Sequence, residues 1–235
     1  GVMLPTMWGE HAAYHDVKYD PFWEACQDLG IVIHFHSGPA PHSEYFGPAF
    51  PNEARSAELP GATGAYVSEV MFWLYRPLTF MLWGGVFERF PRLKAMVVEG
   101  GTMFMVPSWL MLLDHNYTDI QFSAKLGDFR SHLSMAPSEY FARNCGIGAS
   151  CVPRRDLDLK DQIGLKQIMW GSDFPHPEGT WPNTEQYYLD TFKGFDADAG
   201  RQILGENAIQ FYGMDSDYLN GLASDIGPSA SIFNG

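Results

Sequence analysis

The stretch IVIHFHSG, residues 31–38, predicts a β-strand that ends in a polar turn. Because side chains alternate across a strand, His34 and His36 share one face, whereas Ile33 and Phe35 share the other. His36 adjoins the turn, so we expect it at the carboxyl end of the strand, with His34 about 6.6 Å deeper. The pair is compatible with a metal ligand at the mouth of a site or with hydrogen-bonded interior histidines.

The same pattern of a β-rich run, a loop and an amphipathic segment recurs along the chain. Further strands are predicted at 1–5, 94–100, 144–150 and 166–173, and helices at 20–30, 102–117, 138–144, 183–192 and 198–213. Strands that alternate with helices indicate an α/β protein with parallel strands.

Two segments, an apolar stretch and the C-terminal end, bear on how the chain is divided into domains. Residues 66–87 are strongly apolar, but they include Glu69, Arg76 and Pro77, which favours a buried helix or helix pair over a membrane span. The Gly/Ser/Ala-rich end from about Ser216 predicts a mobile or surface-draped terminus. We therefore expect one domain over residues 1–215, followed by a tail over residues 216–235.

Composition narrows the classes of partner. The chain has 235 residues, a formal net charge of −13 and no cluster of basic residues, which argues against nucleic acid and anionic membranes and favours a small-molecule substrate. Three scattered cysteines, interpreted as small buried hydrophobes, and a start without a signal peptide fit a reducing cytoplasm. We also expect a homo-oligomer such as a dimer.

A second strand end carries a carboxylate. In IMWGSDFPHPEGTWP, residues 168–182, Asp173 follows an apolar run directly and precedes a Phe-Pro turn. Functional groups of parallel α/β folds collect at the carboxyl ends of strands. His36 and Asp173 therefore form a candidate site for a divalent ion, although Asp173 could instead serve as a turn or helix-cap residue.

Three motifs carry a family resemblance: WGGVFERFPRLKAMVVEGG (83–101), IMWGSDFPHPEGTWPN (168–183) and ILGENAIQFYG (203–213). They resemble the amidohydrolase-related family of metal-dependent (β/α)₈ TIM barrels, which includes aminocarboxymuconate-semialdehyde decarboxylase and related decarboxylases. The resemblance implies strands 4 to 8 of the barrel, with His36 as the strand 5 ligand, Asp173 as the strand 8 ligand and His34 as a supporting residue.

The resemblance also implies a paired histidine motif on strand 1. No such strand is present in this sequence, so we expect it upstream of Gly1 or on another polypeptide, and we expect residues 1–235 alone to be inactive. His11 and His15, in the loop after the first strand, are weak candidates for substitute ligands; a role of His15 in substrate binding is favoured.

Glu99 departs from the family pattern, because many relatives carry histidine at that strand 6 position. A strand-end carboxylate can bind metal, act as a general base or orient a substrate, although it could also be a solvated charge. Glu99 and Asp173 are the candidate catalytic residues. The candidate substrate-binding residues are His176, Glu178, His42 and His15, with Tyr45, Trp8 and Trp181 as weaker candidates near the pocket.

The sequence thus favours a metal-dependent hydrolase that acts on a small carboxylated, aromatic or cyclic substrate. Zinc is the expected ion, with manganese or iron as alternatives, and it would activate a water. A nonoxidative decarboxylase is the close second hypothesis, and a catalytically incomplete barrel or scaffold is the third.

Overall fold

The computed structural model describes residues 1–6, 10–36, 38, 61–100, 105–119 and 124–234. The chain is an α/β protein that divides into two compact units. Unit 1 comprises Gly1–Val98 and Leu113–Cys145, and unit 2 comprises Glu99–Leu112 and Gly146–Gly235. Each unit contains parallel strands that follow one another in sequence order.

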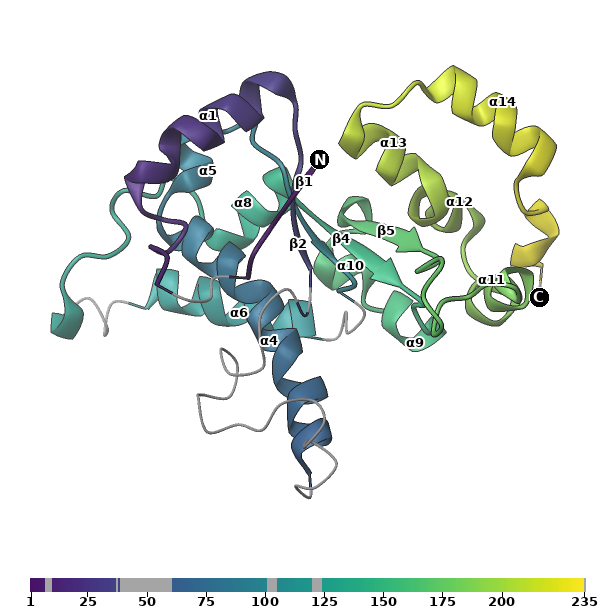
Figure 1. Cartoon of the computed structure of the whole chain (residues 1–235), viewed down its shortest axis with the longest axis horizontal. Coiled ribbons are helices and arrows are strands. Elements are labelled where there is room, and N and C mark those ends of the chain that lie inside the picture. Colours follow the sequence, from purple (N-terminus) through teal and green to yellow (C-terminus); the bar gives the residue numbers. More distant parts are fainter. Residues whose placement is uncertain (7–9, 37, 39–60, 101–104, 120–123, 235) are drawn as a thin grey trace. The chain divides into compact units, whose positions relative to one another are not determined.

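Unit 1 contains three strands, β1 (Val2–Leu4), β2 (Ile33–His36) and β3 (Ala95–Val98). Val2 lies opposite Ile33 in the ladder of β1 and β2, and Ile33 lies opposite Ala95 in the ladder of β2 and β3. Figure 1 shows β1 and β2 running side by side. All three strands fall within the ranges that the sequence predicts.

The helices of unit 1 begin and end at sequence signals. They are η1 (Val17–Tyr19), α1 (Asp20–Leu29), α4 (Ala62–Trp83), α5 (Val86–Arg89) and α8 (Pro137–Asn144), while α6 (Met105–Thr118) spans the boundary between the units. Helix α1 has a proline in its first turn and ends at Gly30, whose φ of 66° suits the left-handed cap.

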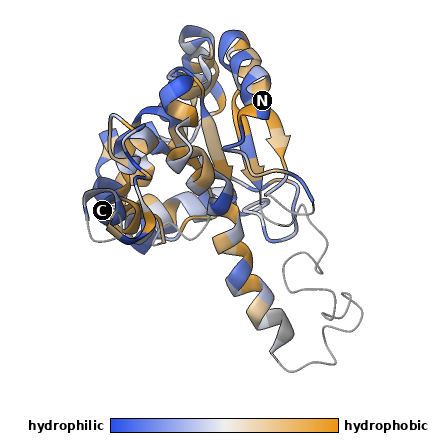
Figure 2. Cartoon of the chain, turned by 90° about the vertical axis from the view of Figure 1, so that its left-hand side faces the viewer, coloured by the Kyte–Doolittle hydropathy of each residue, from blue (hydrophilic) through white to orange (hydrophobic). Residues whose placement is uncertain are grey.

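Helix α4 is the long apolar segment of the sequence. Its C-terminal half buries Leu74, Leu78 and Met81 completely, whereas Val67 and Phe72 nearer its N-terminus are 56% and 60% exposed. Figure 2 shows this N-terminal half extending away from the rest of unit 1. Among the described residues, no helix combines the length and apolarity that a membrane crossing needs.

Unit 2 contains the parallel strands β4 (Cys145–Ser150) and β5 (Ile168–Gly171), paired from Ile147 opposite Ile168 to Ser150 opposite Gly171. Its shorter helices are α9 (Arg154–Leu157), α10 (Lys160–Ile163), η2 (Leu165–Gln167), α11 (Thr184–Phe192), α12 (Ala197–Arg201), the π-helical η3 (Gln202–Glu206) and α13 (Asn207–Tyr212). Five parallel strands alternating with helices are consistent with the TIM-barrel class.

The C-terminal tail is more ordered than its composition predicts. Residues from 216 onward form α14 (Ser216–Ile226) and η4 (Ala230–Phe233). The tail does lie on the surface, since no residue of α14 is buried, but Ile232 is only 4% exposed. The expectation of a mobile or surface-draped end overlooked these helices because Gly, Ser and Ala conceal an amphipathic pattern carried by few residues.

Two buried asparagines fix the chain where it enters a strand. The amide of Asn144, at the end of α8, donates to the carbonyls of Pro91 (3.0 Å) and Leu93 (2.7 Å), just before β3. The amide of Asn207, at the start of α13, donates to Leu165 and Ile168 (both 2.8 Å), at the start of β5. Each amide thus satisfies backbone carbonyls in the segment that leads into a strand, which helps to fix where the strand begins.

We predict that Asn144→Ala lowers the free energy of unfolding by about 2 kcal/mol, because two backbone carbonyls lose their donor in a buried setting. Urea unfolding followed by circular dichroism measures the change. Asn183→Ala is the matched control, since Asn183 is exposed and makes no capping hydrogen bond, and it should change stability by less than about 0.5 kcal/mol. Equal losses in the two variants would contradict the assigned role of Asn144.

Candidate functional site

Three strand-end residues share an uncommon backbone conformation. Glu99 directly follows β3, Cys151 directly follows β4, and Asp173 lies two residues after β5, with φ values of 55°, 50° and 57°. Non-glycine residues rarely adopt this left-handed region, and those that do concentrate at functional sites. All three belong to unit 2. The recurrence at successive strand ends marks this edge as the candidate site.

The three side chains also share an electrostatic environment. Partial burial raises the pKa of the Cys151 thiol, and the negative charges of Asp173, Glu178 and Glu99 raise it further. The Cys151 Sγ lies 3.6 Å from the carbonyl oxygen of Glu178. The three carboxylates are therefore close enough to Cys151 for their charges to raise the pKa of its thiol.

The turn after β3 fixes the position of Glu99. The backbone N–H of Gly100 donates to the carbonyl of Gly148 in β4 (3.1 Å), and Gly100 is buried. Glu99 itself is partly exposed. The glycine therefore allows the backbone to approach β4 closely, while the carboxylate before it stays accessible to solvent.

The loop after β5 holds Asp173 through its own backbone. The His176 N–H donates to Asp173 O (2.8 Å), the Gly179 N–H donates to His176 O (3.0 Å), and the Thr180 N–H donates to Ser172 O (2.9 Å). A Cβ atom on Gly179 would lie only 2.7 Å from Asp173 O and 2.9 Å from Ser172 O. The loop closes tightly because residue 179 has no side chain.

His176 lies between two carboxylates. Its Nδ1 is 3.5 Å from Asp173 Oδ2 and 3.5 Å from Glu178 Oε1. The Asp173 side chain is 16% exposed, His176 is 49% exposed and Glu178 is 78% exposed. Asp173 is thus the shielded member of the group, and His176 links it to solvent. Such an arrangement can hold a proton near Asp173 or orient a polar substrate group.

The histidines of β2 follow the expected alternation. Ile33 and Phe35 are completely buried, whereas His34 and His36 are partly exposed. Burial lowers the pKa of His34, which favours its neutral form and suits a supporting residue. His36 is the last residue of β2, as predicted. It belongs to unit 1 and Asp173 to unit 2, so their joint role as metal ligands stays a prediction.

His15 has a different environment, within unit 1. Its ring stacks on Phe80 with centroids 5.2 Å apart, and a Cβ on Gly84 would lie 2.2 Å from the Cβ of His15. With Trp83 and Phe129, these residues line a largely apolar cavity of about 410 Å³. The substrate-binding role of His15 stays a prediction.

Several other expectations concern residues near the predicted pocket. His42, Tyr45 and Trp8 lie outside the described residues. Trp181 is 66% exposed and makes an edge contact with Phe174, with ring centroids 5.9 Å apart. It is therefore a surface aromatic and not part of the core.

Cys151 is the site residue that the sequence analysis missed. Cys26 and Cys145 are buried, in agreement with their interpretation as small hydrophobes, but Cys151 is partly exposed, and the same interpretation was wrong for it. Its place directly after a predicted strand was the available signal, because Glu99 and Asp173 were selected by that criterion. Cysteine was interpreted as a hydrophobic residue because a thiol has low polarity.

The arrangement of the possible ligand side chains bears on metal binding. Within the described ranges, no group of three or more His, Cys, Asp or Glu side chains is arranged to hold a metal ion. His36 and Asp173 supply the imidazole nitrogen and carboxylate oxygen that zinc and manganese accept, so the donor chemistry is suitable. The described residues thus offer suitable ligand types without a complete ligand set.

Comparison with known proteins identifies the family. A model of the amidohydrolase family matches residues 1–214, and the chain belongs to that family. A 2-amino-3-carboxymuconate-6-semialdehyde decarboxylase from Dictyostelium discoideum is 24% identical over 207 residues, which cover 85% of this chain and 50% of that protein. The chain therefore spans about half the length of this curated relative.

Solved structures agree on the fold. An amidohydrolase from Mycobacterium avium subsp. paratuberculosis K-10 has a TM-score of 0.70 at 22% identity, covering 92% of this chain and 51% of that chain. A dihydroxybenzoic acid decarboxylase from Polaromonas sp. JS666, with bound manganese and an inhibitor, has a TM-score of 0.58 at 19% identity, covering 86% and 55%. At these identities the likeness establishes the fold alone.

We predict that Gly179→Ala lowers the free energy of unfolding by about 1–3 kcal/mol, because its methyl group would overlap backbone oxygens that the loop cannot move independently. Urea unfolding measures the loss. Gly64→Ala is the control, since Gly64 lies in α4 with open space around its Cβ position, and its substitution should be neutral or stabilising. A Gly179→Ala variant as stable as the parent would refute the proposed tight closure.

Proposed function

We propose that this chain contributes to a metal-dependent, nonoxidative decarboxylase whose substrate is a small carboxylated aromatic or cyclic molecule. The observation that carries the proposal is the set of strand-end carboxylates held in left-handed backbone conformations, with Asp173 shielded and beside His176. Membership of the amidohydrolase family and similarity to decarboxylases support the choice of reaction.

His36 and Asp173 are the residues that would hold the divalent ion. When bound, the ion would supply positive charge that orients and polarises the substrate's carboxylate. Manganese is as good a candidate as zinc for this ion, because a structural relative contains manganese. His34 would support His36 from within the strand, with its pKa lowered by burial so that it stays uncharged.

The residues after β5 would supply the proton that the substrate carbon accepts after CO₂ is released. Decarboxylation breaks a carbon–carbon bond, releases CO₂ and leaves an electron pair on carbon, which must then accept one proton. Asp173 and His176, whose Oδ2 and Nδ1 lie 3.5 Å apart, are the pair to which we assign that proton. His176 is half exposed and can exchange the proton with solvent between turnovers.

Hydrolysis is the second candidate function, and Glu99 favours it. A partly exposed carboxylate at a strand end, near Cys151 and Asp173, could remove a proton from the attacking water. In a decarboxylase the same carboxylate would orient a hydroxyl group of the substrate. The two functions therefore assign Glu99 different roles, which mutation can separate.

The first functional prediction concerns the metal. The full-length protein should contain about one divalent ion per chain, and His36→Ala and Asp173→Ala should each lose most of it because a ligand is removed. Inductively coupled plasma mass spectrometry measures the content. His34→Ala is the control, and it should reduce stability more than metal content. Full retention of metal by both ligand variants would rule out the assignment.

The second functional prediction concerns Glu99. Glu99→Gln keeps the shape and removes the charge, so a hydrolase that uses Glu99 as a base should lose about 10²- to 10⁴-fold in turnover. Loss of a substrate-orienting group should instead raise KM, with turnover falling less than about tenfold. Turnover of hydroxybenzoate substrates by the full-length protein, with CO₂ release measured directly, distinguishes the reactions. Absence of CO₂ release from these substrates would contradict decarboxylation.

A further inference from the structure

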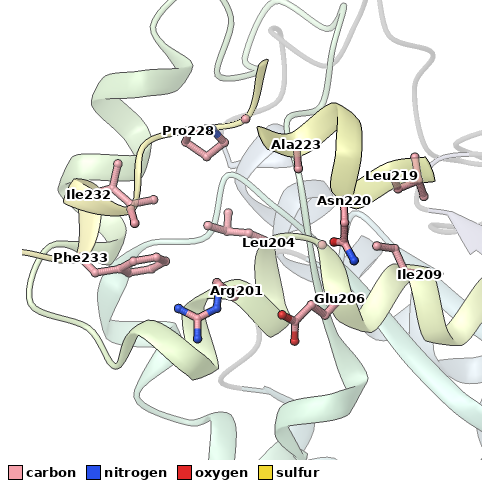
Figure 3. A pocket seen from close by; sticks show the side chains of 13 residues that line it. Arg201, Leu204, Glu206, Ile209, Leu219, Asn220, Ala223, Pro228, Ile232 and Phe233 are labelled. Carbon is pink, nitrogen blue, oxygen red and sulfur yellow. The ribbon is translucent and has the colours of Figure 1, made fainter. Parts of the chain in front are cut away.

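A cavity of about 250 Å³ lies within unit 2, beneath the C-terminal tail. We call it the tail cavity. Leu204 of η3, Ile209 of α13, and Ile232 and Phe233 of η4 contribute apolar walls, while α14 contributes Leu219 and Ala223 (Figure 3). Its size is near the lower end of the range for small-ligand pockets.

The tail cavity lies partly outside the residues that the family model matches. The family match ends at residue 214, whereas α14 and η4, which close one side of the cavity, follow that residue. The opposite wall is η3, a π-helical stretch, and π-helical turns recur at functional sites. The cavity is thus lined both by helices inside the matched range and by helices that follow it.

The far end of the tail is firmly anchored. The Gly194 N–H donates to Phe233 O (3.0 Å), and the Phe233 ring meets Phe192 edge to face, with centroids 6.1 Å apart. A Cβ on Gly200 would lie 2.2 Å from the Phe233 ring, so the aromatic side chain occupies space that only glycine leaves open. The segment that covers the cavity is therefore attached to the rest of unit 2 through η4, after α14 has ended.

Helix α14, which covers the cavity, packs only weakly on the rest of unit 2. None of the residues of α14 is buried, although Leu219 and Ala223 face the cavity. An 11-residue helix is marginal in water without a packed apolar face. A molecule that fills the tail cavity would give this face the contacts it lacks.

The polar lining indicates what kind of molecule fits. The described lining includes one cation, Arg201, one anion, Glu206, and one amide, Asn220 (Figure 3). Arg201 and Asp198 form an exposed ion pair, and with Glu206 these three side chains carry a net charge of −1, which disfavours an added carboxylate. A hydroxyl group can donate to Glu206 and accept from Asn220 or Arg201.

We propose that the tail cavity is a binding site for a small neutral phenol, a single aromatic ring that carries one hydroxyl group and no charge. The ring occupies the space between Leu204, Leu219 and Phe233, and the hydroxyl group lies beside Glu206 and Asn220. Binding stabilises α14 against the rest of unit 2. The site is separate from the strand-end residues and does not depend on the reaction proposed above.

The chain offers a closely matched pair of test variants. Gly205 lines the tail cavity, and a Cβ added there meets no atom within 4 Å, so Gly205→Leu should fill the cavity without a clash. Gly221 lies in α14, also with open space at its Cβ position, but it is not among the lining residues. Gly221→Leu is therefore the control for adding leucine to a helix.

The experiment is a titration of the full chain with 4-methylphenol, followed by two-dimensional amide NMR. We expect saturable shifts at Leu204 and Phe233, with a Kd of about 1 mM or tighter for a ligand of this size. Gly205→Leu should weaken binding at least about tenfold, Gly221→Leu should leave it unchanged, and toluene and 4-methylbenzoate should each bind at least about tenfold more weakly.

Asp173→Asn should keep the same binding, which separates the tail cavity from the strand-end site. If Gly205→Leu does not fold, Ala223→Met fills the cavity from α14 and should weaken binding in the same way. Absence of saturable shifts, undiminished binding to the filled cavity, or toluene or 4-methylbenzoate binding as tightly as 4-methylphenol would each overturn the proposal.

Discussion

The position of Asp173 depends on one steric constraint, the absence of a side chain at Gly179. The loop after β5 folds back so closely that a methyl group there would overlap the carbonyl oxygens of Asp173 and Ser172. Three backbone hydrogen bonds close the loop, and Asp173 is held in a left-handed conformation. The backbone at Asp173 is consequently fixed by the loop itself, while its shielded carboxylate lies 3.5 Å from the Nδ1 of His176.

The same arrangement recurs at successive strand ends. Glu99 and Cys151 share the left-handed backbone of Asp173, so three neighbouring strands each turn sharply where they end. The starts of β3 and β5 are fixed separately, by the amides of Asn144 and Asn207. Where both ends of a strand are fixed, the backbone determines which side chains face the candidate site. A fold of this kind can support different reactions when only a few residues at the strand ends change.

The tail illustrates the opposite situation, in which packing is incomplete. Phe233 anchors η4 through Phe192 and Gly200, while α14 spans a cavity without burying any residue. Because η4 is anchored and α14 is not buried, a small molecule that fills the cavity would give α14 new contacts and stabilise it. The family match ends at residue 214, before this segment begins.

The sequence by itself determined the class of fold and the strand ends, because hydrophobic periodicity and the residue after each apolar run are local properties. It identified five strands and placed His36, Glu99 and Asp173 where strands end. Only the tertiary structure decided that Cys151 lies near the carboxylates and that Phe233 anchors a helical tail. Both depend on contacts between residues distant in sequence, so the position of Cys151 after a strand could suggest its role but could not show which carboxylates lie near it.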